Sequence, residues 1–506
     1  MRILGISSQF HDAAVSVIDN GDIVFAGHAE RYSKHKNDAF INRGLVHDAL
    51  NHGMPDQIVY HEKHWAKVTR NFSIRNWGFV REPSARQWVK KFYPELRGVP
   101  SKSYWHHQTH AAAGVLTSEF DECAVMVIDA IGEWDSASIW QWRDGELRKL
   151  HSVWYPNSLG LLYSAVTQYV GLKPMEDEYI LMGMAAYGNE TTAWEIQKQI
   201  RQKLFKHYTV YKKERECLHT KINLQKGIPE GIFDASWDHF DIARACQNET
   251  ELRISAYANY ARLMTRSKNL VFMGGVALNC VANSNLHNMY DNVYIMPNPG
   301  DAGSSLGGAA LSYYEQTGNK PTGFTPYLGY NIPGKYPIKK ALDSLEKNEL
   351  FGIANGRAEF GPRALGNRSL CADPRGPEVK DRMNVIKKRQ KFSPFAPMIL
   401  REHVGEVFEM PGGITDAPYM QFVAKCKYPE LYPAIIHHDG TSRVQTVSRK
   451  DHPDLHKLLK EFYKRTGCPM LLNTSLNIKG QPIVNDVADA KAFTRKYKVK
   501  VHTKDN

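Results

Sequence analysis

The chain opens with short apolar runs that are separated by polar turns. Apolar residues dominate positions 3–7, 13–19 and 22–30, and runs of this length predict three strands. Asn20 and Gly21 separate the second run from the third, and this dipeptide is the two-residue turn typical of a β-hairpin. The sequence therefore predicts that the chain begins with a small sheet.

The turn between the first two predicted strands is polar. Its hydroxyl, imidazole and carboxylate side chains are those of Ser7, Ser8, His11 and Asp12. A turn of this kind can present backbone N–H groups to a phosphate. His11 is a candidate catalytic residue, and an ordinary surface histidine is the alternative interpretation.

The same pattern returns in the middle of the chain. Residues 124–142 predict a strand, a polar turn with Asp129 and Gly132, and a second strand. A further apolar strand ends at Gly274 and Gly275, where a helix begins, and a nucleotide can approach the backbone closely at such a point. Together these segments predict a duplicated α/β domain with phosphate-binding loops.

A helix is predicted over residues 105–114, and it carries two histidines four positions apart. His106 and His110 then project from one face of the helix and can bind a single metal ion. We expect the third ligand to be Asp301, in a Gly-rich turn after an apolar run. Two imidazoles and one carboxylate leave positions open for water or a phosphate oxygen, which suits Fe(II), zinc or manganese. A polar helix surface is the alternative.

The length of the chain and a break near its middle predict two domains. A chain of 506 residues is too long for one core. Pro321, Gly323 and Pro326 mark a linker, so the expected domains are residues 1–325 and 326–506.

The second predicted domain has three arginines on a loop that is broken by Gly and Pro. These are Arg357, Arg363 and Arg368. Converging guanidinium groups are a common way to bind phosphate or carbamoyl-phosphate oxygens, whereas a chance surface cluster is the alternative.

The net charge of +12 is concentrated in two segments. Residues 61–102 carry ten Lys and Arg against three Glu, and residues 198–226 carry nine against two, so each segment has a charge of +7. The first segment also contains many aromatic residues, a mixture that suits a phosphate backbone with stacking bases. Nucleic acid is therefore a possible partner, and two solvated helix faces are the alternative.

Cysteine usage and hydropathy indicate in which cellular compartment the protein is expected. The seven cysteines are scattered without a C-x-x-C pair, which argues for reduced thiols and against a disulfide scaffold. The first residues read as a strand without a signal peptide, and no apolar run approaches the length that spans a bilayer. We expect a soluble cytoplasmic protein that does not contact membrane; its oligomeric state is not predicted.

Seven motifs occur in the order seen in one enzyme family. They are SSQFHDAAVSV, AERYSKHKND, HHQTHAAAG, SLGLLYSAVT, EYILMGMAAYG, MGGVALNCVAN and GDAGSSLGGAAL. The chain thereby resembles the O-carbamoyltransferase family, which includes nodulation-factor and antibiotic carbamoyltransferases. The resemblance implies an α/β fold: a duplicated ATPase-like domain of the actin/hexokinase superfamily, similar to the threonylcarbamoyl-transferase fold, followed by a smaller YrdC-like α/β domain.

The resemblance also implies roles for individual residues. His106, His110 and Asp301 are the implied metal ligands, with Fe(II) favoured and zinc or manganese possible, and His11 is the implied aid to deprotonation of the acceptor hydroxyl. The residues that it assigns to nucleotide or carbamoyl phosphate, together with the two from the polar turn, are Asp129, Gly132, Gly274, Gly275, Asn279, Arg363, Arg368, Lys387, Arg389, Arg443, Ser475 and Asn477.

Four positions depart from the family pattern. Ile180 stands where lysine is usual, Ser393 where arginine is common, Ala130 where glycine is common and Leu476 where phenylalanine is usual. The lost lysine and arginine weaken the positive charge near the ligands and indicate a changed acceptor or a slower enzyme. Because the implied catalytic and metal residues are present, we expect an active enzyme.

The expected reaction has two steps, with ATP (as its Mg complex) and carbamoyl phosphate as co-substrates. The second domain makes carbamoyl-adenylate, and the first domain transfers the carbamoyl group to a hydroxyl. The favoured acceptor is a 5-hydroxymethylated pyrimidine, hydroxymethylcytosine above all, in DNA or as a nucleotide, because a small neutral sugar has no use for the positive field. An antibiotic or oligosaccharide hydroxyl and adenosine in tRNA are alternatives. A non-catalytic nucleic-acid-binding protein on an ATPase-like fold is the alternative of another class.

Overall fold

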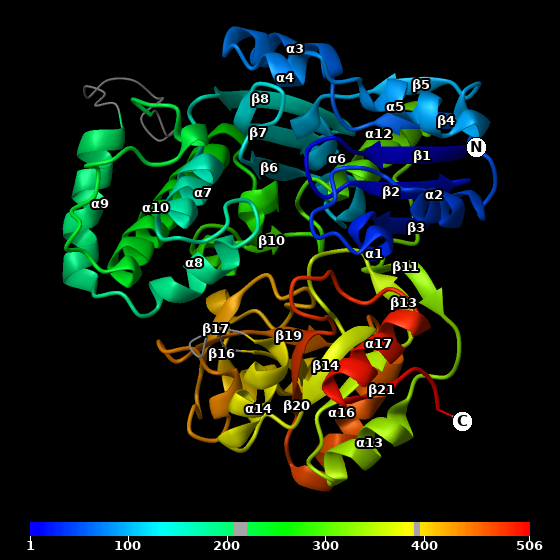
Figure 1. Ribbon diagram of the computed structural model, residues 1–506, viewed down its shortest axis with the longest axis vertical. Coiled ribbons are helices and arrows are strands. Elements are labelled where there is room, and N and C mark those ends of the chain that lie inside the picture. Colours follow the sequence, from blue (N-terminus) through cyan, green and yellow to red (C-terminus); the bar gives the residue numbers. More distant parts are fainter. Residues whose placement is uncertain (206–219, 389–394, 506) are drawn as a thin grey trace. The chain divides into compact units, whose positions relative to one another are not determined.

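The computed structural model describes residues 1–205, 220–388 and 395–505, and it divides into two compact units (Figure 1). Unit 1 comprises residues 1–24 and 39–324, and unit 2 comprises residues 25–38 and 325–506. Both units contain mixed sheets with helices packed on them, which is the predicted α/β class. Among the helices in the described part of the chain, none has the length and apolar character needed to cross a bilayer.

Unit 1 contains two five-stranded sheets with the same strand order (Figure 1). The order is β3-β2-β1-β4-β5 in the first sheet and β8-β7-β6-β9-β10 in the second. In each sheet, the first strand along the chain pairs antiparallel with the next strand and parallel with a later one. This repeated order is the duplication that the sequence predicted. The strands are β1 (Arg2–Ser7), β2 (Ala14–Asp19), β3 (Asp22–His28), β4 (Gln57–Tyr60), β5 (Ser101–Ser103), β6 (Cys123–Ile128), β7 (Asp135–Arg143), β8 (Glu146–Trp154), β9 (Asn269–Met273) and β10 (Asn292–Tyr294).

The predicted hairpin between β2 and β3 is present. Asn20 has φ of 49° and Gly21 has φ of 97°, so both turn residues are in the left-handed region that a type I′ turn requires. The Asn-Gly pair adopts this conformation at little cost, which explains why local sequence was sufficient to predict the turn.

Two helices of unit 1 pack so closely that only glycine fits between them. A Cβ atom on Gly307 of α12 would lie 1.9 Å from the carbonyl oxygen of Thr109 in α6. This contact brings the start of α12 beside the first turns of α6. The longer helices of unit 1 are α2 (Arg43–Leu50), α3 (His64–Ser73), α5 (Ala85–Phe92), α6 (His106–Thr117), α7 (Leu159–Tyr169), α8 (Glu178–Ala185), α9 (Glu190–Leu204), α10 (His239–Thr265) and α12 (Gly303–Thr317), and the short ones are α4 (Trp77–Val80) and α11 (Cys280–Ser284).

Residues 25–38 belong to unit 2, whereas the sequence prediction placed them in the first domain. They contain the end of β3 and the short helix α1 (Glu30–Ser33). The Arg31 guanidinium donates to the carbonyl oxygen of Gly361 at 2.9 Å, and the Lys34 ammonium pairs with the Asp489 carboxylate. The prediction was wrong here because these partners are more than 300 residues away in sequence.

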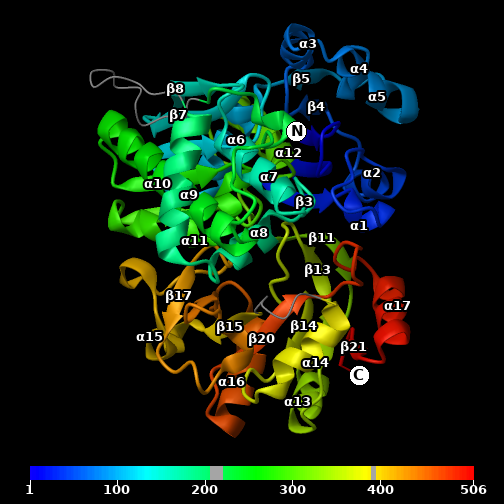
Figure 2. The ribbon, with the colours of Figure 1, turned by 60° about the vertical axis from the view of Figure 1, so that its left-hand side comes forward.

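Unit 2 is built on a six-stranded mixed sheet with the order β19-β15-β20-β14-β12-β21 (Figure 2). Smaller sheets pair β11 with β13 and join β16, β17 and β18. The strands are β11 (Tyr327–Ile332), β12 (Phe351–Ala354), β13 (Gly356–Glu359), β14 (Arg368–Ala372), β15 (Ala396–Leu400), β16 (Phe408–Glu409), β17 (Val423–Cys426), β18 (Thr441–Arg443), β19 (Gln445–Val447), β20 (Met470–Ser475) and β21 (Lys500–His502). The helices are α13 (Ile338–Glu346), α14 (Glu378–Lys387), α15 (Val404–Val407), α16 (Pro453–Thr466) and α17 (Val487–Tyr497).

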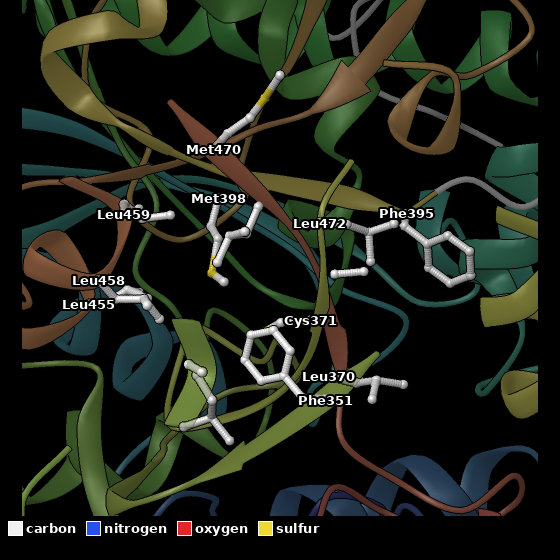
Figure 3. Close-up of a cluster of buried hydrophobic side chains, with 14 of the residues drawn as sticks. Phe351, Leu370, Cys371, Phe395, Met398, Leu455, Leu458, Leu459, Met470 and Leu472 are labelled. Carbon is white, nitrogen blue, oxygen red and sulfur yellow. The ribbon is translucent and has the colours of Figure 1, made fainter. Parts of the chain in front are cut away.

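The core of unit 2 lies between the central strands of this sheet and its helices (Figure 3). Leu370 on β14, Met398 on β15 and Leu472 on β20 are buried there, together with Leu458 on α16. Burying such side chains stabilises the unit by roughly 1.5–3 kcal/mol each. The sheet is therefore a rigid support for the polar residues at its strand ends.

Candidate metal centre and nucleotide sites

Two histidines and two carboxylates meet in unit 1. His106 and His110 lie in the first turns of α6, Asp129 directly follows β6, and Asp301 precedes α12. All four side chains are buried, and one ligand atom from each lies within 4.8 Å of the others. The Nε2 atoms of both histidines are 3.3 Å from Oδ2 of Asp129 and 3.4 Å from Oδ1 of Asp301.

The cluster is held by contacts around the start of α6. The buried Glu133 carboxylate accepts the backbone N–H of His106, at 3.0 and 3.1 Å, and that of Lys63 at 2.7 Å. Arg70 of α3 donates in turn to the carbonyl oxygens of Gly132 and Glu133. The loop from Asp129 to Glu133 is thereby fixed against the helix that carries both histidines.

The buried groups of the cluster shift one another's pKa values. Burial alone would lower the pKa of His106, but the carboxylates of Asp301 and Asp129 outweigh it and raise that pKa well above its usual value. Burial opposes ionisation of Asp301 as well, yet the nearby imidazoles of His11 and His106 hold its pKa well below its usual value. The carboxylates and imidazoles of the cluster therefore stabilise each other's charged forms.

This donor set fits a divalent metal ion. The two Nε2 atoms are 3.1 Å apart and point at the same carboxylate oxygens, so the imidazoles are gathered around one point. One divalent cation would compensate the negative charge of the two carboxylates. Imidazole with carboxylate suits Fe(II), zinc and manganese alike, so the donors alone do not select the metal.

Asp129 belongs to this cluster, although the sequence assigned it to the nucleotide. Its Oδ1 atom accepts the N–H of Ala130 at 2.8 Å, which turns Oδ2 toward the histidines. The position of Asp129 in the sequence was a signal for this role. Asp129 directly follows a buried strand in the second half of the duplication, and the end of that strand can meet the turn before α12.

His11 lies at the edge of the cluster. Its Nδ1 atom is 2.9 Å from Oδ2 of Asp12, and its Nε2 atom is 3.7 Å from Oδ2 of Asp301. Burial lowers its pKa, but Asp301 and Asp12 together raise it to about 9. The distance from the metal ligands suits a residue that handles a proton beside them.

The predicted glycines line the same loop. A Cβ atom on Gly274 (φ 92°) would lie 2.2 Å from the carbonyl oxygen of Ile128, and one on Gly132 would lie 3.1 Å from the His107 ring. On Gly275 it would lie 3.1 Å from Oδ1 of Asp129. Packing and backbone conformation therefore require glycine at position 274, whether or not a nucleotide binds there, whereas a Cβ at positions 132 and 275 would fit only tightly.

Asn279 has an observed role at the start of α11. Its side chain accepts the N–H of Ala282 at 3.1 Å and pairs with the amide of Gln247. It thus caps the short helix after the Gly-Gly turn. A nucleotide contact for Asn279 stays a prediction.

In unit 2, three predicted residues converge at the end of β20. The Lys387 ammonium donates to the backbone carbonyl of Ser475 at 2.7 Å and also to the side chain of Asn477. The Ser475 hydroxyl donates to Oδ1 of Asn477 at 2.8 Å. Arg389 lies outside the described residues. Arg363 is half-buried on its loop, and Arg443 is half-buried at the end of β18 with a buried Nε.

Arg368 does not fit its predicted contact with phosphate. Its side chain has no exposed surface. The guanidinium donates to backbone carbonyl oxygens of Asn355, Asn367 and Asn485, at 2.8 to 3.2 Å, as well as to those of Gly356 and Tyr330. Because these donors are used within the unit, Arg368 organises the loops around β14.

Replacing Arg368 with methionine should therefore destabilise unit 2 by at least about 3 kcal/mol, since several buried carbonyl groups lose their donor. Thermal unfolding measures this loss. Arg495→Met, on the exposed face of α17 in the same unit, is the matched control and should change the unfolding temperature little. Unchanged unfolding together with lost carbamoyl-phosphate binding in Arg368→Met would restore the phosphate role.

Two of the basic residues in segment 61–102 also have structural roles. The prediction placed Lys67 and Arg70 on a surface that binds nucleic acid, but both are buried. Lys67 pairs with Glu62 at 3.1 Å, and Arg70 holds the loop of the metal centre. The exposed cations of this segment are Arg75, Arg81, Arg86, Lys90, Lys91, Arg97 and Lys102. In segment 198–226, residues 206–219 lie outside the described part.

Comparisons with known proteins cover both units. The carbamoyltransferase N-terminus family matches residues 90–311, and the carbamoyltransferase C-terminus family matches residues 342–505. An uncharacterized protein of Synechocystis sp., sll1178, is 33% identical over 97% of this chain and 93% of its own length. Nodulation protein NolO of Bradyrhizobium diazoefficiens is 35% identical over 76% of this chain and 75% of its own length.

Similarity to solved structures is weaker. Full-length HypF in the phosphate- and nucleotide-bound form is 15% identical and covers 63% of this chain and 56% of that chain, with a TM-score of 0.37. A TM-score this low supports no conclusion about the site.

Proposed function

Because the chain belongs to the carbamoyltransferase family, we propose that it is an O-carbamoyltransferase that works through carbamoyl-adenylate. In the first step, carbamoyl phosphate, ATP and water give carbamoyl-adenylate, phosphate and pyrophosphate. In the second step, the acceptor oxygen forms a bond to the carbamoyl carbon and AMP leaves. The match of both units to the two halves of this family carries the proposal.

We assign the first step to unit 2. Lys387, at the end of α14, presents its ammonium beside the Ser475 hydroxyl and the Asn477 amide. A cation next to two neutral polar groups is suited to hold phosphate or carbamoyl oxygens while charge moves from ATP to pyrophosphate. Arg363 and Arg443 supply further positive charge from neighbouring loops of the same unit.

We assign the second step to the metal centre of unit 1. His106, His110, Asp129 and Asp301 would hold a divalent cation, which polarises a carbonyl or phosphoryl oxygen when it is bound. His11 is placed to take the proton from the acceptor hydroxyl, with Asp12 fixing its ring through the 2.9 Å contact. A divalent cation held by Asp301 would offset the carboxylate that raises the His11 pKa, and the imidazole would then be neutral and able to act as a base. The burial of the cluster excludes water, which protects a hydrolytically fragile adenylate.

The acceptor that we propose is a 5-hydroxymethylated pyrimidine, hydroxymethylcytosine in DNA above all. Five exposed cations of segment 61–102 support this choice, because no ion pair within the described residues uses them: Arg75, Arg81, Arg86, Lys90 and Lys91. Exposed aromatic rings lie near them in sequence, with Phe72 59% and Trp77 52% exposed. Cations with exposed rings suit a nucleic-acid strand better than a neutral sugar.

The protein should add one carbamoyl group to DNA that contains hydroxymethylcytosine when carbamoyl phosphate and ATP are supplied. Mass spectrometry of the digested nucleosides measures this product. The Michaelis constant for the DNA should rise steeply with salt, because counterions compete with the exposed cations. DNA with unmodified cytosine is the control. Efficient modification of a sugar hydroxyl beside unmodified DNA would contradict the proposed acceptor.

A further inference from the structure

A groove of about 890 Å³ lies in unit 1 between the two basic segments. One wall is the link between α3 and α4, with Arg75 and Asn76, and the other comes from residues 222–229, with Asn223, Gln225 and Lys226. Among the described residues that line it there are two cations and no carboxylate. A volume of this size is at the upper end of the range of small-ligand pockets.

The groove is connected to the candidate metal centre through Tyr155 and Arg70. The Tyr155 hydroxyl donates to Gln225 at 2.8 Å, and Asn223 donates to the same hydroxyl. The Arg70 guanidinium lies 5.9 Å from the centre of the Tyr155 ring. Arg70 in turn holds Glu133, whose carboxylate accepts the N–H of His106. A chain of contacts through Tyr155 and Arg70 therefore links the groove to the loop that holds the metal centre.

An aromatic surface adjoins the groove. Phe72 and Trp77 flank its lining residues Arg75 and Asn76 in sequence, and their rings meet edge to face at 5.2 Å between centroids. Both rings are more than half exposed. Exposed rings beside a cationic groove can stack on bases while the cations pair with phosphates.

We infer that this groove binds the sugar-phosphate backbone of the acceptor DNA strand and leads its target base toward the metal centre. Arg75 and Lys226 pair with phosphates from opposite walls. The side-chain amides of Asn76 and Gln225 offer hydrogen bonds to sugar or base edges. This inference rests on the proposed function, since it names how the acceptor reaches the site.

The test measures binding separately from transfer. Fluorescence anisotropy with a labelled single-stranded oligonucleotide containing hydroxymethylcytosine gives the Kd of the full chain at several salt concentrations. Arg75→Glu and Lys226→Glu should each weaken binding about tenfold and reduce the slope of log K against log salt by about one. Circular dichroism checks that each variant is folded.

Lys268→Glu is the matched control, because it changes the charge equally. Lys268 is 77% exposed and precedes β9, whereas Gly274 follows the other end of that strand at the metal centre. Its Kd should equal that of the unaltered protein. If the two groove variants bind like Lys268→Glu, or if hydroxymethyl-deoxycytidine monophosphate competes as well as the oligonucleotide, the inference is wrong.

The same experiment separates this inference from the proposed function. Binding that depends on Arg75 and Lys226, without a carbamoylated product, leaves the groove as a DNA site and rejects the acceptor. Carbamoylated DNA with unchanged binding by both groove variants keeps the acceptor and rejects the groove.

Discussion

Asp301→Asn is expected to remove bound metal and to lower carbamoyl transfer at least about 100-fold. The Asp301 carboxylate lies 3.4 Å from the Nε2 atoms of both metal-binding histidines and 3.7 Å from Nε2 of His11. It therefore contacts both the proposed metal ligands and the proposed base. An amide in its place keeps the size of the side chain but loses the negative charge. Elemental analysis of the purified variant measures the metal, and the carbamoylated product measures transfer.

Pyrophosphate release should survive in this variant, because unit 2 contains the residues assigned to that step. Asp291→Asn is a suitable control, since it makes the same change on an exposed carboxylate before β10. His106→Ala should behave like Asp301→Asn. Full metal content and full transfer in either altered cluster would show that these residues are not the ligands.

Lys387→Ala and His11→Asn are expected to fail at different steps. Without the Lys387 ammonium, the polar groups of Ser475 and Asn477 lose the cation they surround, and pyrophosphate release that depends on carbamoyl phosphate should fall by about 100-fold or more. His11→Asn should release pyrophosphate normally and form little product, because the acceptor proton has no base. A pyrophosphate assay and product analysis on the same samples separate the two.

Lys457→Ala provides the comparison for lysine removal, since Lys457 is exposed on α16. It should match the unaltered protein in both assays. If Lys387→Ala and His11→Asn lose pyrophosphate release to the same degree, the two steps are not divided between the two units.

Local sequence predicted the features that local forces determine. The Asn20-Gly21 hairpin and the helix that places His106 and His110 on one face follow from backbone preferences and side-chain spacing. The duplicated strand–turn–strand pattern also followed, because the apolar runs and polar turns recur in the same sequence. Asp301 was found because few acids stand at a Gly-rich strand end.

The features that sequence missed depend on partners far along the chain. Nothing near Arg70 in sequence indicates its burial, because the loop at Glu133 supplies its partner only in the folded unit. Lys67 is an exception: its partner Glu62 is close in sequence, but the burial of both side chains comes from the fold. Arg368 was predicted to bind phosphate because its real partners are hidden from the sequence. Its five acceptors are backbone carbonyl oxygens, which no pattern of side chains reveals. Long-range pairing of this kind is set by tertiary structure rather than by propensity.

The insertion of residues 25–38 into unit 2 determines how the protein can be dissected. A fragment that starts at residue 325 would lack α1, and with it the Arg31 contact to Gly361 and the Lys34 pair with Asp489. Exchange of the carboxy-terminal half between relatives would likewise set a foreign α1 against Gly361 and Asp489 unless both segments are moved together. Any fragment or chimaera of this chain therefore has to keep residues 25–38 together with residues 325–506 to preserve unit 2.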